Sequence, residues 1–154
     1  MAVQVKGARP LTNVLVVDDS TVELTLIEDA LTGAGFNVET LSHGRDIVEA
    51  AIASEPDFIV LDIFMPERSG LKACEDLRTH PLTQSIPVIF LTADTSADSV
   101  IESLHLGCID YICKPVAMSS LVDIIKRHDV VKRIRDIWSP AKTELKRIRR
   151  KYSQ

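Results

Sequence analysis

The chain has 154 residues, of which 45% are hydrophobic and 26% are charged, a composition typical of one soluble globular domain. No apolar run approaches the roughly 20 residues that cross a bilayer, and residues 1–10 lack the apolar stretch of a secretory signal, so we expect a cytoplasmic protein without a membrane span. The three cysteines show no zinc-ligand spacing and are odd in number, and we expect them to be reduced and half-buried.

Charge is unevenly distributed along the chain. The net charge is -4, but residues 1–125 hold 19 of the 22 acidic residues and only 7 of the 18 basic ones. An acidic body is therefore followed by a basic end. We divide the chain into an N-terminal arm (1–11), a folded domain (12–128) and a basic helical extension (129–154).

Short apolar runs predict the strands of a sheet. Three runs are continuous, without the alternation of a half-exposed sheet, which is typical of buried parallel strands. Two weaker runs complete the set. In chain order the five predicted strands are Val14–Val17, Asn37–Leu41, Phe58–Leu61, Val88–Leu91 and Cys108–Ile112.

The segments between the strands carry apolar residues three and four positions apart, as amphipathic helices do. Examples are Val22 to Leu31, Ile47 to Ile52 and Val100 to Leu106. Strand and helix alternate five times, which predicts an α/β fold with a doubly wound parallel sheet and helices on both faces. Ligands of such sheets bind beyond the carboxyl ends of the strands.

A long helix is predicted after Val116, with a start at Ser120 and Asp123. It would extend for about 30 Å at 1.5 Å per residue, more than is needed to cover one sheet face. Its distal apolar stripe therefore needs another partner, and a second copy of the chain is the simplest choice. The stripe consists of Val130, Ile134, Ile137 and Trp138.

Ser139-Pro140 predicts a break and a second, short basic helix with Leu145, Ile148 and Tyr152 on one side. This segment is either a solvated helix or frayed tail, a contact for nucleic acid or membrane, or a connector to an output domain. No DNA-reading motif is evident, so nucleic-acid binding is not expected.

Chemically capable side chains follow four of the five predicted strands: Asp18, Asp19, Asp62, Thr92 and Lys114. Carboxylates gathered in one crevice repel each other, by roughly 4 kcal/mol per pair at ~4 Å and an effective dielectric near 20. A bound cation relieves this repulsion, and oxygen ligands without Cys or His favour Mg²⁺. The set predicts phosphoryl transfer, with the solitary Asp62 as nucleophile.

Four segments carry a resemblance: Asp18-Asp19, Asp62 to Gly70, Leu91-Thr92-Ala93 and Gly107 to Pro115. In order and spacing they resemble the receiver domains of two-component response regulators, over about residues 12–128. Four motifs in register are far more specific than one. The resemblance implies a CheY-like, flavodoxin-like sheet with the strand order 2-1-3-4-5.

The resemblance also implies roles for particular residues. Asp62 would be phosphorylated, and Asp19 and Asp62 would bind Mg²⁺, which Mn²⁺ can replace. Asp18 would help through a water molecule, and the backbone carbonyl of Phe64 would complete the protein ligands. The bulky Phe64 side chain stands where a polar one could position water, so the lifetime of the phosphoryl group is left open.

The same resemblance assigns phosphoryl binding and switching to Thr92, Ala93, Lys114 and Tyr111. Thr92 would donate its hydroxyl to the phosphoryl group, Lys114 would pair with it, and Tyr111 would turn inward as Thr92 moves. The bond before Pro115 would be cis. Pro66 would shape the loop after Asp62, and Gly70 would relieve backbone strain at the following helix.

Taken singly, these residues have ordinary explanations. Asp18-Asp19 alone could cap a helix, and Thr92 could do the same. However, Thr95 and Asp98 already offer a capping-box-like start, which leaves Thr92 for the site.

The resemblance implies a histidine kinase or histidine phosphotransfer protein as donor, a downstream protein as target, and a phosphoacceptor rather than an enzyme. The chain could also be the N-terminal receiver of a larger regulator with an output domain. One rival is a phosphatase or phosphotransferase that forms an aspartyl phosphate, but enzymes of the haloacid dehalogenase kind carry a second Asp where Phe64 stands. The other is a flavodoxin-like cofactor binder, which the acidic, glycine-free segment Asp18 to Thr21 opposes.

Overall fold

The computed structural model describes residues 11–94, 96–138 and 141–153. Within them, five parallel strands form one sheet in the order β2-β1-β3-β4-β5, as expected. The central strands β3 and β4 are buried at every position, which explains their continuous apolar sequences. The strands are β1 (Asn13–Val17), β2 (Asn37–Leu41), β3 (Phe58–Asp62), β4 (Val88–Thr92) and β5 (Asp110–Cys113).

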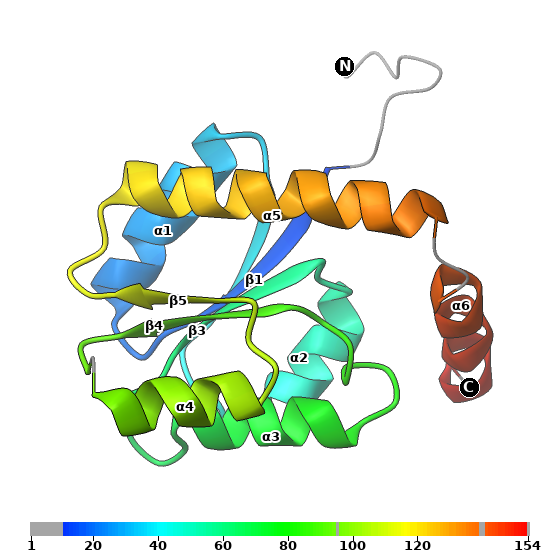
Figure 1. Ribbon diagram of the computed structural model, residues 1–154, viewed down its shortest axis with the longest axis horizontal. Helices are drawn as coiled ribbons and strands as arrows, with labels where there is room; N and C mark the ends of the chain where they lie inside the picture. The colour runs from blue at the N-terminus through cyan, green and yellow to red at the C-terminus, as the bar shows by residue number, and fades with distance from the viewer. Residues whose placement is uncertain (1–10, 95, 139–140, 154) are drawn as a thin grey trace.

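Helices cover both faces of the sheet, so the predicted doubly wound architecture is confirmed (Figure 1). Two of them, α1 and α5, lie on one face, and α2, α3 and α4 lie on the other. The helices are α1 (Thr21–Gly33), α2 (Ile47–Ser54), α3 (Gly70–Thr79), α4 (Ala97–His105), α5 (Met118–Trp138) and α6 (Ala141–Tyr152).

Each face of the sheet has its own apolar core, since successive strand residues point to opposite sides. On one side, Leu15 and Leu61 pack with Ile47 of α2 and Leu77 of α3. The other core joins the remaining strand residues to α1 and α5; its members include Val16, Val60, Ile27, Leu31, Leu121 and Ile125. The two cores fix the strand ends, and hence the site, relative to one another.

Several predicted strand ends differ by one residue, and three predicted element starts need a physical explanation. The fifth strand begins at Asp110 instead of Cys108, because Gly107, at φ +74°, first closes the preceding helix with a bond from its N–H to Leu104. Helix α4 is capped by Ser96, whose hydroxyl accepts from the N–H of Ser99, whereas Thr95 lies outside the described residues.

The third is the start of α5, which begins at Met118 because Leu121 N–H already bonds to the carbonyl of Ala117. The cysteines also need a correction: all three are free, but only Cys108 is half-buried, whereas Cys74 is buried and Cys113 exposed.

Helix α5 is long, as expected. It continues without a break past residue 128, where we predicted the end of the folded domain. Its distal part leaves Val130, Val131, Ile134 and Ile137 each more than half exposed. The side chain of Trp138, which we predicted to join this stripe, lies outside the described residues.

Helix α6 follows and contacts the body of the domain. Arg149 forms an ion pair with Glu55, and the rings of His80 and Tyr152 lie 5.8 Å apart. Among the described residues, no helix is long and apolar enough to cross a membrane. The proposed N-terminal arm falls almost wholly on residues 1–10, outside the described part.

Candidate functional site

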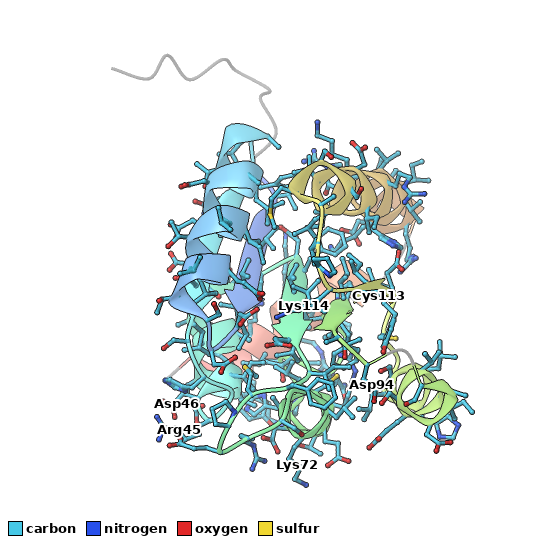
Figure 2. The ribbon with its side chains drawn as sticks, turned by 90° about the vertical axis from the view of Figure 1, so that its left-hand side faces the viewer. Arg45, Asp46, Lys72, Asp94, Cys113 and Lys114 are labelled. Carbon is cyan, nitrogen blue, oxygen red and sulfur yellow. The ribbon has the colours of Figure 1, made fainter. Side chains whose placement is uncertain are left out.

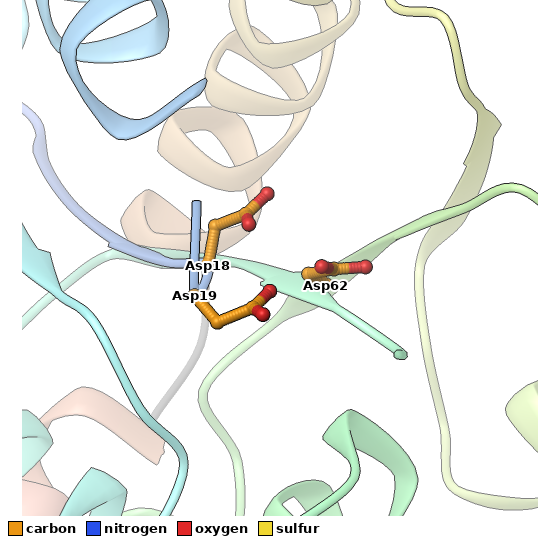
Figure 3. Close-up of side chains that lie close together, drawn as sticks. All are labelled: Asp18, Asp19 and Asp62. Carbon is orange, nitrogen blue, oxygen red and sulfur yellow. The ribbon is translucent and has the colours of Figure 1, made fainter. Parts of the chain in front are cut away.

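Three aspartates meet at the carboxyl edge of the sheet. Asp18 and Asp19 follow β1, and Asp62 ends β3, the strand paired with β1 up to Val17 and Leu61. One carboxylate oxygen from each aspartate lies within 4.8 Å of the other two. Figure 3 shows the three side chains together, with the Asp18 and Asp19 carboxylates directed towards Asp62. The sequence prediction that these acids cluster is therefore confirmed in its geometry.

Lys114 brings a positive charge to the same edge from β5. Its backbone N–H donates to the carbonyl of Thr92 at 2.7 Å, which holds the chain beside the end of β4. Its ammonium lies 3.1 Å from Asp18 Oδ2 and 3.3 Å from Asp62 Oδ2. Figure 2 looks onto this edge, with Lys114 beside the strand ends and Asp94 nearer α4. The peptide bond between Lys114 and Pro115 is cis, as expected.

Burial sets the protonation of the carboxylates. Asp18 is 0% exposed and Asp62 only 3%, whereas Asp19 is exposed. Burial raises the pKa of Asp18 to about 7, with further contributions from its hydrogen bond to Glu23 and the charge of Asp62. Burial also raises the pKa of Asp62, although Lys114 opposes this. The cluster therefore favours a partner that carries positive charge.

Lys114 stays charged in this setting. Burial by itself would lower the pKa of its ammonium, but hydrogen bonds to Glu23 and Asp18 outweigh that effect and raise it. The hydrogen bond with Asp18 in turn lowers the pKa of Glu23. Lys114 therefore remains positively charged beside four carboxyl groups, those of Asp18, Asp19, Asp62 and Glu23.

The donor atoms fit Mg²⁺ rather than a softer metal. The cluster offers carboxylate oxygens only, which are the ligands that Mg²⁺ and Mn²⁺ prefer. The backbone of Phe64 lies next to it, because its N–H donates to Asp62 Oδ1 at 3.3 Å. The role of the Phe64 carbonyl as a ligand remains a prediction, and the Phe64 side chain is 54% exposed.

Thr92 ends β4 beside this cluster, and its side chain is fully buried. Its hydroxyl accepts a hydrogen bond from the N–H of Asp94 at 3.0 Å. The Tyr111 hydroxyl donates to the carbonyl of the same Asp94, so both predicted switch residues hold one loop. Ala93 lies exposed between Thr92 and Asp94.

Gly70 lies against the backbone of Asp62 at the end of β3, and the reason for a glycine there differs from the predicted one. A Cβ at this position would lie 2.1 Å from the backbone oxygen of Asp62, so the residue provides space, not relief of a strained φ. Its N–H donates to the carbonyl of Ile63 at 2.8 Å. Pro66 lies in the intervening loop, where its carbonyl accepts from Arg68 N–H at 2.8 Å, consistent with the predicted shaping role.

Sequence reasoning missed Glu23. It lies in the first turn of α1, and its carboxylate contacts the Lys114 ammonium. The pattern Ser20-x-x-Glu23 was a usable signal, but it is typical of a capping box, in which the Glu side chain returns to the N-cap N–H. Here the Ser20 N–H bonds to Asp18 Oδ1 at 2.9 Å instead, which leaves the Glu23 carboxylate for Lys114.

Comparisons with known proteins agree with this geometry. Residues 14–126 match the family model described as the response regulator receiver domain. The transcriptional regulatory protein GltR of Pseudomonas aeruginosa is 33% identical over 114 residues, covering 74% of this chain and 47% of that protein. A protein-glutamate methylesterase/protein-glutamine glutaminase of Archaeoglobus fulgidus is 41% identical, covering 72% of this chain and 31% of that protein. The chain therefore spans less than half the length of these curated relatives.

Solved structures show the same fold. The chemotaxis protein CheY4 of Vibrio cholerae has a TM-score of 0.73 at 28% identity, covering 77% of this chain and 98% of that one. The receiver domain of the sensor histidine kinase PA1611 of Pseudomonas aeruginosa has a TM-score of 0.69 at 29% identity, covering 77% and 97%, and was solved with a magnesium ion in its active-site cleft. With its aspartate cluster, its lysine and the family match over residues 14–126, this chain belongs to the response regulator receiver domains.

Proposed function

We propose that Asp62 accepts a phosphoryl group from a phosphohistidine on a histidine kinase or a histidine phosphotransfer protein. The observation that carries the proposal is the position of Asp62: buried at the end of β3, within 4.8 Å of two other carboxylates and 3.3 Å from the Lys114 ammonium. A nucleophilic carboxylate beside cationic charge is what phosphoryl transfer requires.

In the proposed step, an Asp62 oxygen forms a bond to phosphorus as the nitrogen–phosphorus bond of the donor breaks and the donor histidine leaves. Asp19 and Asp62 would hold Mg²⁺ directly and Asp18 through a water molecule. The ion supplies positive charge for the phosphoryl oxygens. Lys114 pairs with one of those oxygens, and its raised pKa keeps it protonated for this role.

The output would be a change in the loop after β4. Thr92 and Tyr111 both bond to Asp94, so a Thr92 hydroxyl that turns to the phosphoryl group releases one of the two contacts. We propose that the populations of two arrangements of this loop shift on phosphorylation, and that a downstream protein reads the surface formed by α4, β5 and α5.

We assign the chain no turnover of its own beyond assisting the gain and loss of its phosphoryl group. The rival aspartyl-phosphate enzyme lacks support, because Phe64 stands where such enzymes carry a second Asp. The matched segment covers only 31% of the methylesterase relative and 47% of the transcriptional regulatory protein GltR. An output domain in the same polypeptide is therefore a further proposal, and the cytoplasmic location stays a prediction.

We also propose that two copies associate through the distal part of α5. Its exposed apolar stripe, formed by Val130, Val131, Ile134 and Ile137, lies on one helix and extends past the sheet that the proximal part covers. Contiguous exposed apolar side chains of this kind are typical of protein–protein contacts.

The proposed phosphorylation is tested by intact-protein mass spectrometry after incubation with acetyl phosphate and Mg²⁺. Wild-type protein is expected to gain one phosphoryl group, and EDTA is expected to abolish the gain. Asp62→Asn should gain none, whereas Asp57→Asn, at the opposite end of β3, should be labelled normally. Equal labelling of wild type and Asp62→Asn would end the assignment.

A further inference from the structure

Glu23 is a fourth carboxylate at the site, and it comes from a helix instead of a strand end. Its backbone N–H donates to the Ser20 hydroxyl at 3.3 Å, which fixes it in the first turn of α1. From there its side chain reaches the Lys114 ammonium. At 39% exposure it is far more accessible than the side chain of Asp18 or Asp62.

Lys114 has three carboxylate partners and three N–H donors. Asp18 and Asp62 lie 3.1 Å and 3.3 Å from Nζ, and the Glu23 carboxylate also contacts it. The ammonium carries three N–H groups; two of them donate to Asp18 and Glu23, and Asp62 is an ion-pair partner. A phosphoryl oxygen that arrives on Asp62 must therefore compete for the Lys114 ammonium with carboxylates that already surround it.

Glu23 is the partner best placed to leave. Water can take over its hydrogen bonds because it is partly exposed, whereas Oδ2 of the fully buried Asp18 would lose its Lys114 donor at a place that water does not reach. Glu23 also adds negative charge where an anionic phosphodonor must approach.

From this geometry we propose that Glu23 is a positioning residue: it holds Lys114 before transfer and thereby slows phosphorylation of Asp62. The inference rests on the proposed function, since it concerns the same lysine and the same acceptor. A residue of helix α1 would then influence the rate of Asp62 phosphorylation, which the motifs at the strand ends do not predict by themselves.

The first experiment compares initial phosphorylation rates with acetyl phosphate at saturating Mg²⁺. Glu23→Gln keeps the shape of the side chain but removes the charge, and it is expected to accelerate labelling by about threefold to tenfold, the effect of one partly screened charge nearby. Glu23→Ala should act in the same direction. Glu28→Gln removes an equal charge from an exposed position of the same helix and should leave the rate unchanged.

The second experiment observes the contact without any phosphorylation. The side-chain ammonium resonance of Lys114, assigned by NMR through its loss in Lys114→Gln, is expected to shift in Glu23→Gln and to stay in place in Glu28→Gln. A residue that only stabilises α1 would not produce this difference.

The outcomes separate the two proposals. If wild-type protein is not labelled at all, the proposed function fails, while the NMR comparison still reports on the contact. If wild type is labelled and Glu23→Gln is equally fast or slower, or if the Lys114 resonance does not respond, the role of Glu23 is overturned.

Discussion

Lys114 and Asp62 lie 3.3 Å apart although β4 lies between β3, which ends at Asp62, and β5, which ends just before Lys114. The backbone bond from Lys114 to the carbonyl of Thr92 anchors the lysine beside that middle strand, and its long side chain spans the remaining distance. Lys114 supplies positive charge to the site, and Asp62 is the nucleophile that we propose. Metal binding, stability and assembly can each be tested around it.

Removing the exposed carboxylate of the cluster should weaken metal binding without unfolding the protein. We expect Asp19→Asn to lower the Mg²⁺ affinity at least about tenfold, roughly 1.4 kcal/mol, because a hard cation loses one anionic ligand. Isothermal titration calorimetry at pH 8 measures this change. Asp29→Asn, an exposed carboxylate on α1 outside the cluster, serves as control and should bind Mg²⁺ as wild type does.

The metal-free protein should lose stability as the pH rises. The pKa of Asp18 is raised in the folded state from 3.8 to about 7, so its contribution is fully present below pH 3.8 and is lost as the pH rises through 7. Asp62 shifts in the same direction. Urea unfolding in EDTA should therefore show a lower free energy of unfolding at pH 8 than at pH 5.5.

This pH effect should be specific to the cluster. We expect Asp18→Asn to reduce the difference between pH 5.5 and pH 8 by about 1 kcal/mol or more, and Mg²⁺ to restore stability at pH 8 in wild type. An identical pH profile for wild type and Asp18→Asn would show that Asp18 titrates near its ordinary value.

Gly70 should tolerate no side chain. A Cβ there would overlap the backbone oxygen of Asp62 at 2.1 Å, so Gly70→Ala is expected to cost about 2 to 3 kcal/mol and to weaken Mg²⁺ binding as the loop shifts. The matched control is Gly33→Ala at the end of α1, where nothing lies within 4 Å of a new Cβ. That substitution should stabilise the protein by about 0.4 to 1 kcal/mol in the same urea experiment.

Self-association should depend on the distal stripe of α5. Ile134→Glu places a charge in the middle of this exposed surface and is expected to convert dimers to monomers in analytical ultracentrifugation. Leu26→Glu changes a similarly exposed apolar residue on α1 and should leave the dimer intact. A wild-type protein that sediments as a monomer at high concentration would rule out the proposed dimer.

The sheet could be predicted from sequence because its central strands are buried on both faces and read as continuous apolar runs, such as Phe58 to Leu61. Topology then placed Asp18, Asp19 and Asp62 together, since parallel strands share one carboxyl edge. The predicted start of β5 was two residues too early. Gly107 has a left-handed conformation, so the strand begins only at Asp110, and the apolar residues 108–109 do not reveal this in the sequence.

Side-chain choices between alternative partners could not be predicted. Ser20 and Glu23 have the spacing of a capping box, and only the structure shows that Glu23 turns to Lys114 while Ser20 N–H bonds to Asp18. Likewise, the shared contact of Thr92 and Tyr111 with Asp94 depends on the path of the β4–α4 loop. Such contacts follow from three-dimensional proximity, which local sequence patterns do not encode.

The most direct test of the central claim is the position of the phosphoryl group on the chain. Protein treated with acetyl phosphate and Mg²⁺ is reduced with sodium borohydride, which converts an aspartyl phosphate to homoserine, and is then digested and sequenced by tandem mass spectrometry. The account predicts homoserine at position 62 and nowhere else. Homoserine at position 18 or 19, or a phosphoryl group recovered on a histidine with position 62 unchanged, would contradict it.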